Sequence, residues 1–529
     1  MNINHQNLFV ILLLGFVFFV PFFSMQNFSP AVDEITHLPS GYSYLKTGEI
    51  KLNPQHPPLM KMLAALPLLF LDLKFDPNDP NLAEPEIREW KFGQDLLFNN
   101  GIDRLIFWGR IPIILISVLL GIYVFKWSKE LFGYGAGIAG LFIYALMPNI
   151  IANAQLITMD LGVTAFCFIA LYYLWKFTNN SAKRDIILSG LFLGLALGAK
   201  FSAIFLLPIF LIVLIVHVHK KYRNSSLLFK INSLLKIILP IFGLAYLTVW
   251  ALYLFPTDPL FYWHGLNTVY ADHKADYNFY LNGSFSGDGW WYYFLWAFII
   301  KTPVPFLAVL SAGLIYWKKQ GLSIRNGLFI FLPVALFLFV TSWKGRNIGV
   351  RYILPIYPFL ILYVSGYLAI TMGTIAKSKF AMVPIVIIVI LAGWYIFSSV
   401  SIYPDYLAYF NEFVGGSNNG YKYLDDSNID LGYDLKRLAE YQNKEPDLKV
   451  AFAWSTYVDA GRFYGIKNIE TLNSKKLWLT PNGKYAVSTH AVIRTRLAGQ
   501  VNKIDQINWM DSYKPIDRIG QSFLIYEFK

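Results

Sequence analysis

The sequence contains few charged residues and almost no cysteine. Only 15% of its 529 residues are charged, whereas a soluble domain usually carries about 25%. The one cysteine, Cys167, lies within an apolar run, which excludes a disulfide framework and a cysteine-type metal site. The chain also lacks a P-loop, a glycine-rich dinucleotide motif after a strand, a nucleophile elbow and a visible internal repeat. Nothing in it therefore supports ATP-driven or inverted-repeat transport.

Apolar and aromatic residues dominate instead. The sequence is 56% hydrophobic and 18% aromatic, with a mean hydropathy of +0.44, as expected of an integral membrane protein. Its net charge is +12, and nucleic-acid binding is one interpretation of such a basic chain. Most of the positive charge falls in short loops between apolar runs, which favours a role in membrane topology. We expect no nucleic-acid partner.

Apolar runs of membrane-spanning length predict about eleven transmembrane helices. They lie near 8–26, 105–125, 135–157, 161–177, 185–199, 201–218, 237–255, 291–316, 327–342, 352–372 and 381–402. The first run has no preceding Lys or Arg and no clear cleavage site, which favours a retained signal-anchor. The run 59–71 is too short to span comfortably, so we expect an interfacial helix there.

The Lys and Arg residues of the short loops predict the orientation of the chain. With alternating spans they all fall on one side, the predicted cytoplasmic side: Lys126, Lys129, Lys176, Lys183, Arg184, Lys220, Lys221, Arg223, Lys230, Lys236, Lys318, Lys319, Arg325, Lys377 and Lys379. Three larger pieces, 27–104, 256–290 and 403–529, then face the outside. The prediction is therefore a multi-pass protein of the plasma or inner membrane.

Two domains are expected. Residues 1–402 form the transmembrane domain, and 403–529 form a small extracytoplasmic α/β domain. The tail has a higher charge density and no long apolar run. Its sequence predicts strands at 449–452, 485–488 and 523–528 and a helix near 434–443.

An acidic pair, Asp33 and Glu34, follows the first span. Charges at a membrane boundary are costly and often functional. A carboxylate there could act as a general base towards an acceptor hydroxyl. The alternative is that Asp33 caps the helix that follows it.

Two further outer segments carry candidate residues. His56 and Lys61 flank Pro57 and Pro58 in the run HPPL at 56–59, where a cation could bind a lipid phosphate or Lys61 could simply snorkel to the headgroups.

Asp160 closes a short turn between two spans, as a functional carboxylate or as a helix cap. Arg110, near the start of the second span, could pair with a carboxylate or bind phosphate.

Three cations stand out in the second half of the chain. Lys301 lies about ten residues into an apolar run and needs a partner, for which a phosphate or a carboxylate would serve. Arg346 and Arg351 lie outside, against the positive-inside trend, and suggest an anionic ligand. The spacing of His264 and His273 matches no compact zinc pattern, so no metal ligand is predicted, although a divalent cation stays open.

Together these motifs resemble one family. The acidic pair, HPPL at 56–59, Asp160, GWWYYF at 289–294 with KTP at 301–303, and RYILPIYP at 351–358 are similar to the C-type membrane glycosyltransferases. The nearest branch comprises the dolichyl-phosphate-mannose–protein mannosyltransferases and their bacterial relatives, including the lipid A aminoarabinose transferases. YPDYLAYFN at 403–411 and DSNIDLGYD at 426–434 are typical of bacterial members.

The resemblance implies an inverting transfer of a sugar from a polyprenyl-phosphate donor. It implies that Asp33, with Glu34 beside it, carries catalysis and that Asp160 helps to form the acceptor site. Arg110 takes the place of an important arginine, while His56 and Lys61 take the place of groups that contact the lipid phosphate. The acceptor would be a protein, a lipid or a cell-envelope glycan.

Two other functions stay open from the residues alone. One is a transporter or flippase for polyprenyl lipids, which would need no carboxylate pair such as Asp33 and Asp160 on one face. The other is a non-catalytic envelope assembly protein whose tail does the work, which would need no cations buried near that face.

Overall fold

The computed structural model of the chain describes residues 5–82, 85–272, 277–317, 321–376, 382–455, 457–470, 481–502 and 512–529. Within these residues, eight helices are long and apolar enough to cross a membrane. They are α1 (His5–Ser24), α5 (Ile102–Phe132), α8 (Asp160–Asn180), η4–α10 (Phe201–Phe205 and Leu206–Lys221), α11 (Leu227–Leu252), α15 (Ile324–Lys344), η6–α16 (Val350–Ile356 and Tyr357–Ile375) and α17 (Met382–Val400). The predicted polytopic, mainly α fold is confirmed.

Against the prediction of about eleven spans, the described residues contain eight such helices, or up to ten spans if two bent helix pairs each cross once. The first pair, α6 (Tyr134–Ala145) and α7 (Pro148–Ala154), bends by 63°. The second, α13 (Tyr293–Lys301) and α14 (Val304–Ile315), bends by 117°. Each break has a proline, Pro148 or Pro303, which cannot continue the preceding helix.

The one remaining predicted span, 185–199, corresponds to the helix α9 (Lys183–Ala199). It has only 17 residues, which is at the lower limit of the length that crosses a bilayer.

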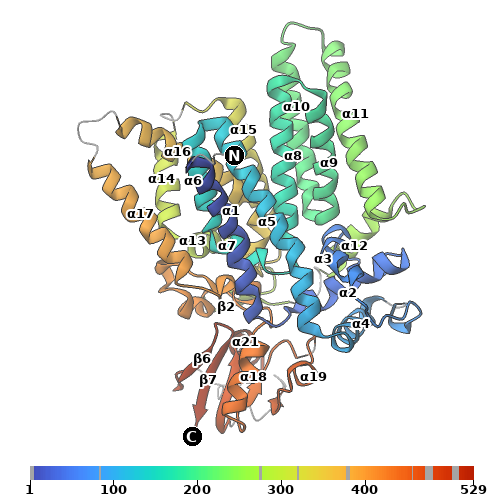
Figure 1. The fold of residues 1–529 in the computed structure, drawn as a ribbon, viewed down its shortest axis with the longest axis vertical. Coiled ribbons are helices and arrows are strands. Elements are labelled where there is room, and N and C mark those ends of the chain that lie inside the picture. Colours follow the sequence, from blue (N-terminus) through green and yellow to red (C-terminus); the bar gives the residue numbers. More distant parts are fainter. Residues whose placement is uncertain are drawn as a thin grey trace.

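The three pieces predicted to face the outside gather at one end of the helical bundle (Figure 1). They include α2 (Val32–Thr47), α3 (Leu59–Ala65), α4 (Pro85–Asn99), α12 (Phe261–Asp272) and the hairpin of β1 (Phe279–Leu281) and β2 (Ser284–Ser286). The loop between α10 and α11, with its cluster of basic residues, lies at the opposite end. Lys318, Lys319, Lys377 and Lys379 lie outside the described residues.

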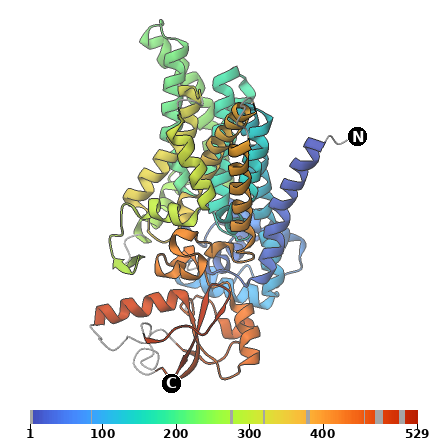
Figure 2. The same ribbon diagram turned by 90° about the vertical axis from the view of Figure 1, so that its left-hand side faces the viewer.

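A five-stranded mixed sheet lies below the bundle, near the C-terminus (Figures 1 and 2). Its strand order is β4-β3-β5-β7-β6, with β3 parallel to β4 and β5, and β7 antiparallel to β5 and β6. The strands are β3 (Lys449–Ala451), β4 (Ile469–Glu470), β5 (Gly483–Ser488), β6 (Asp517–Ile519) and β7 (Phe523–Phe528). The accompanying helices are α18 (Leu435–Lys444), α19 (Ala460–Tyr464) and α21 (Thr489–Asn502). The three predicted strands and the predicted helix are all present.

Short 3-10 turns join these parts. They are η1 (Met25–Asn27), η2 (Leu66–Phe70), η3 (Pro80–Leu82), η7 (Tyr406–Ala408), η8 (Glu412–Val414), η9 (Ser417–Lys422) and η10 (Asp426–Asn428). The run predicted as an interfacial helix is α3 with η2. It packs against α2 and α5, while Phe70 at its end is 90% exposed.

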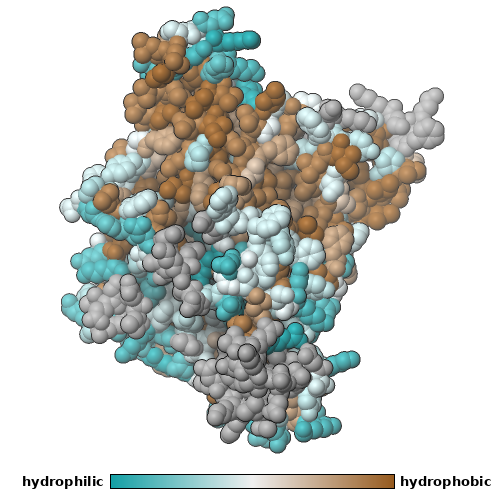
Figure 3. Space-filling model, turned by 180° about the vertical axis from the view of Figure 1, so that it is seen from behind, coloured by the Kyte–Doolittle hydropathy of each residue, from teal (hydrophilic) through white to brown (hydrophobic). Residues whose placement is uncertain are grey.

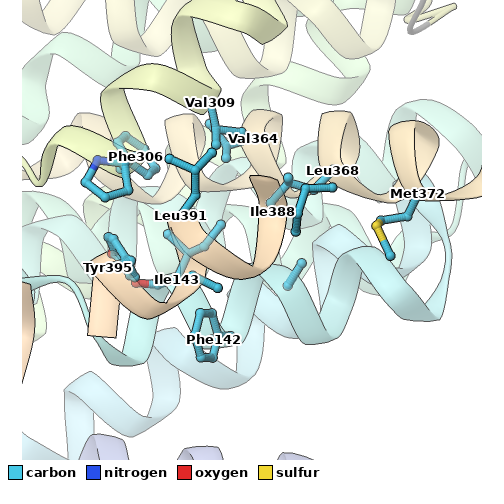
Figure 4. A pocket seen from close by; sticks show the side chains of 13 residues that line it. Phe142, Ile143, Phe306, Val309, Val364, Leu368, Met372, Ile388, Leu391 and Tyr395 are labelled. Atoms are coloured by element: carbon cyan, nitrogen blue, oxygen red, sulfur yellow. The ribbon is translucent and has the colours of Figure 1, made fainter. Parts of the chain in front are cut away.

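On the face drawn in Figure 3, hydrophobic residues dominate the upper, helical part, and hydrophilic residues gather in the lower part. Leu227 and Ile387, for example, are largely exposed. In water such a continuous apolar surface would be costly, whereas a bilayer covers it. A cavity of about 240 Å³ lies among α6, α14, α16 and α17 within this apolar part (Figure 4). Its one polar side chain, Tyr395, already donates to the Ile143 carbonyl oxygen.

Candidate active site

Asp33 lies one residue inside the first turn of α2, with Ala31 as the N-cap. It therefore does not serve as the cap that the sequence left open. Its carboxylate Oδ2 accepts a hydrogen bond of 2.5 Å from Nη1 of Arg351. The side chains are 23% and 14% exposed, so the pair lies at an accessible edge of the interior.

Glu34, the next residue, faces the other way. Its Oε1 accepts from Nε of Arg110 and from the Ile157 amide, both at 2.9 Å. Its Oε2 accepts from Nη2 of Arg110 at 2.6 Å and from the amide of the N-cap residue Ala31 at 2.7 Å, which is the half of a capping box that the third helical residue supplies. The carboxylate is fully buried and saturated with donors.

Arg110 uses all five of its N–H donors inside the protein. Besides Glu34, it donates to the carbonyl oxygens of Met25, Phe28 and Ser29. It therefore has no donor left for a lipid phosphate. This ion pair joins α1, α2, α5 and the turn before α8, and so fixes the helix that carries Asp33.

A second carboxylate–cation pair lies beside the first. Asp160 is the first residue of α8, where its side chain caps no amide. Its Oδ1 accepts a hydrogen bond of 2.6 Å from Nζ of Lys200, and Lys200 also lies 4.5 Å from the centre of the Tyr352 ring. Burial raises the pKa of Asp33, but Arg351, His37 and Lys200 together hold it below its ordinary value. Lys200 is thus within electrostatic reach of Asp33, and the two pairs form one site.

The sequence analysis did not select Lys200. A signal was present, because Lys200 is a lone cation between two apolar runs on the side that carries Asp160. His37 was also missed. It lies one helical turn after Asp33, and its Nδ1 is 2.9 Å from the Ile157 carbonyl oxygen, to which that nitrogen donates.

His56 lies near His37, with 5.4 Å between the ring centres. Burial, followed by His37 and Lys200, lowers the pKa of His56 well below 6.5. The imidazole is therefore neutral at pH 7 rather than the cation that the sequence suggested. It makes no hydrogen bond with the described residues and lines a cavity, where it can donate to a ligand.

This cavity has a volume of about 330 Å³ and a polar end. Lys200, His56, Gln55 and Tyr352 form its polar part, and most of its remaining lining is apolar, with Phe201, Ile204, Phe205, Leu266, Val269 and Val340. Oε1 of Gln55 is buried without a hydrogen-bond partner in the described structure. The cavity thus combines an apolar wall with hydrogen-bond donors and a cation beside Asp33 and Asp160.

Lys61 and Lys301 do not reach this cavity. Nζ of Lys61 donates to the Asn53 and His56 carbonyl oxygens at 2.7 and 2.8 Å and to the Tyr44 hydroxyl at 3.0 Å, which folds the loop before α3. Burial lowers the pKa of Lys61 to about 7. It neither snorkels nor has a free donor.

Nζ of Lys301 donates to the Leu407 and Asn428 carbonyl oxygens, both at 2.6 Å. Its partners are therefore carbonyl groups, where the sequence suggested a phosphate or a carboxylate.

Arg346 lies apart from the two ion pairs, with its guanidinium 5.3 Å from the Tyr277 ring centre. Its Nε is buried without a hydrogen-bond partner in the described structure. The described residues contain no cluster of three or more His, Cys, Asp or Glu side chains that could hold a metal ion. His273, which was considered with His264, lies outside them.

Residues 102–250 match the family model of dolichyl-phosphate-mannose-protein mannosyltransferases. The fold is similar to the apo crystal structure of ArnT from Cupriavidus metallidurans, with a TM-score of 0.50 and 12% identity. The match covers 99% of this chain and 98% of that chain. The chain therefore has the fold of the C-type glycosyltransferases.

A second solved structure shares this fold. The apo oligosaccharyltransferase of Archaeoglobus fulgidus has a TM-score of 0.52 and 11% identity over 87% of this chain and 64% of that one. No curated protein matches the sequence. The resemblance predicted from the motifs is confirmed at the level of the membrane fold, and residues 102–250 match a model of the predicted branch.

Proposed function

We propose that this glycosyltransferase transfers a sugar from a polyprenyl-phosphate donor to an acceptor hydroxyl on the outer side of the membrane. The cavity carries the proposal, because it offers an apolar wall to a prenyl chain and Lys200 and His56 to a phosphate. Its polar end lies beside the two carboxylate pairs. The family model matched by residues 102–250 is named for a donor of this class.

Asp33 is the proposed general base. In a single inverting displacement, the acceptor oxygen attacks the anomeric carbon while its proton passes to the Asp33 carboxylate. The bond from the anomeric carbon to the phosphate oxygen breaks, and the polyprenyl phosphate leaves with the bonding electrons. Cations offset the negative charge that develops on this leaving group. Arg351 and Lys200 are suited to this, because each has N–H donors beyond those it uses in the structure.

The remaining predicted site residues receive different roles. We assign Asp160 to the acceptor side and retain Arg346 as a possible outer contact for an anionic acceptor or donor. Glu34, Arg110, Lys61 and Lys301 are framework residues in this proposal, because each has its partners within the protein and none of the four lines the cavity.

The outward orientation follows from the basic loops at the opposite end of the bundle. The tail 403–529 is proposed as one extracytoplasmic unit that shapes the acceptor side, and a protein, lipid or glycan could serve as acceptor.

A panel of polyprenyl-phosphate sugars tests the proposal. The purified protein in lipid nanodiscs is incubated with each donor, and release of polyprenyl phosphate is measured with wild type and with Asp33→Asn. Release by the wild type alone supports the proposal. An absence of turnover with every donor, together with an absence of prenyl-phosphate binding, would reject the donor class.

A further inference from the structure

Both carboxylates of the site are covered by cations in the structure. Arg351 binds Asp33 at 2.5 Å and Lys200 binds Asp160 at 2.6 Å. A carboxylate paired in this way is a weak base, because the cation stabilises its charged form. Asp33 therefore has to lose some of this pairing before it can accept a proton efficiently.

The two cations have unused hydrogen-bonding capacity, unlike Arg110. Nε of Arg351 is buried without a hydrogen-bond partner in the described structure. Lys200 makes one hydrogen bond with the described residues and lies over the Tyr352 ring. Arg110, in contrast, uses every donor that it has.

These cations also lie where an entering phosphate would meet them. Lys200, His56 and Tyr352 line the cavity, and Arg351 lies within electrostatic reach of His56. A phosphate monoester or diester presents several acceptor oxygens, and the arginine fork matches them in a bidentate manner. A phosphate can therefore compete with a single carboxylate for each cation.

We propose that the phosphate of the lipid donor draws Arg351 from Asp33 and Lys200 from Asp160, so that donor binding itself frees the two carboxylates for the reaction. The inference rests on the proposed donor class and adds an order to the reaction. The base becomes competent only when the leaving group is in place. In the absence of donor, the two ion pairs keep both carboxylates paired with cations, so that neither accepts a proton efficiently.

Carboxylate labelling tests this proposal. The full-length protein in detergent is treated with a water-soluble carbodiimide and an amine, with and without farnesyl phosphate, and the modified peptides are quantified by mass spectrometry. Farnesol and inorganic phosphate are the matched ligands that lack the phosphate or the prenyl chain. Native mass spectrometry of the same samples measures whether farnesyl phosphate is bound.

Farnesyl phosphate should raise the labelling of Asp33 and Asp160 by about ten-fold, the change expected when the pKa of a carboxyl rises by one unit. Farnesol should leave it unchanged. An equal response to inorganic phosphate would assign the effect to any phosphate rather than to the lipid. Asp95 is the internal control and should not respond. It pairs with Arg462 at an N–O distance of 2.6 Å and does not line the cavity.

Two variants separate removal of the cation from shielding by the ligand. Arg351→Gln should give high labelling of Asp33 without ligand, and Lys200→Met should do the same for Asp160. Arg351→Met, which also removes the cation, serves if the glutamine variant fails to fold. Bound farnesyl phosphate with unchanged labelling of both carboxylates in the wild type would overturn this inference alone. Failure to bind farnesyl phosphate would overturn the donor class and this inference with it.

Discussion

Arg351 donates a 2.5 Å hydrogen bond to Asp33 across 318 positions of sequence. One segment, residues 426–434, forms hydrogen bonds with the backbone next to each partner. The Val350 amide donates to Oδ1 of Asn428, and the Val32 amide donates to the Leu431 carbonyl oxygen. Gly349 is required beside it, because a Cβ there would lie 2.1 Å from Oγ of Ser427. The geometry of the ion pair therefore depends on a segment that contains neither residue.

Asp33→Asn should abolish sugar transfer while the fold is retained. Loss of a general base costs about 10²- to 10⁴-fold in rate, and the amide is nearly isosteric with the carboxyl group. Turnover is measured with the best donor of the panel, and folding by thermal unfolding. Asp95→Asn, which also removes a carboxylate from an arginine pair, is the control and should transfer at the wild-type rate. Wild-type activity in Asp33→Asn would refute the catalytic assignment.

Glu34→Gln should instead damage the fold. Breaking a buried ion pair by removing one partner costs about 3–5 kcal/mol, since Arg110 would retain its charge in the interior. The midpoint of thermal unfolding should fall clearly, whether or not donor is present. Glu49→Gln removes an exposed pair with Lys51 and should leave the midpoint almost unchanged. A stable but inactive Glu34→Gln protein would instead support the catalytic role that the sequence suggested for Glu34.

Lys200→Met should weaken donor binding. A hydrogen bond to a charged group contributes about 1.5–3 kcal/mol, so the Kd for farnesyl phosphate should rise by roughly ten- to one-hundred-fold. Binding is measured by titration in nanodiscs. Lys436→Met removes a comparable lysine–aspartate pair, with Asp103, and should bind normally. Equal affinities in the two variants would place the phosphate elsewhere.

The contribution of His490 to stability should depend on pH. Its Nδ1 lies 2.7 Å from Oδ1 of Asp425. Burial alone would lower the pKa of His490, but Asp425 raises it above 6.5. A raised pKa adds stability that is complete below the unfolded value near 6.5 and is lost as pH rises through the folded value.

His490→Gln should therefore lower the unfolding midpoint more in mildly acidic than in alkaline buffer. The comparison uses wild type and variant at each pH. A difference that grows with rising pH would contradict the predicted sign.

Several features were predictable from the sequence because they depend on local pattern. Long apolar runs give the helices, and short apolar or aromatic stretches give β3, β5 and β7. The distribution of Lys and Arg predicted which pieces gather at one end of the bundle. Asp33 and Asp160 could be selected because a carboxylate at a membrane boundary is costly and stands out against its apolar neighbours.

Pairing, in contrast, was decided by the tertiary structure. Asp33 and Glu34 are adjacent in sequence, yet successive side chains on a helix point about 100° apart. One therefore reaches Arg351 in the accessible site, and the other reaches Arg110 in the interior. The roles of Lys61 and Lys301 as buried anchors, and of Lys200 as the partner of Asp160, depend on distant segments. The sequence by itself determined which charged residues are unusual. Only the folded chain decided which of them have all their hydrogen-bonding groups paired within the protein and which retain donors for a ligand, because this pairing depends on three-dimensional contacts.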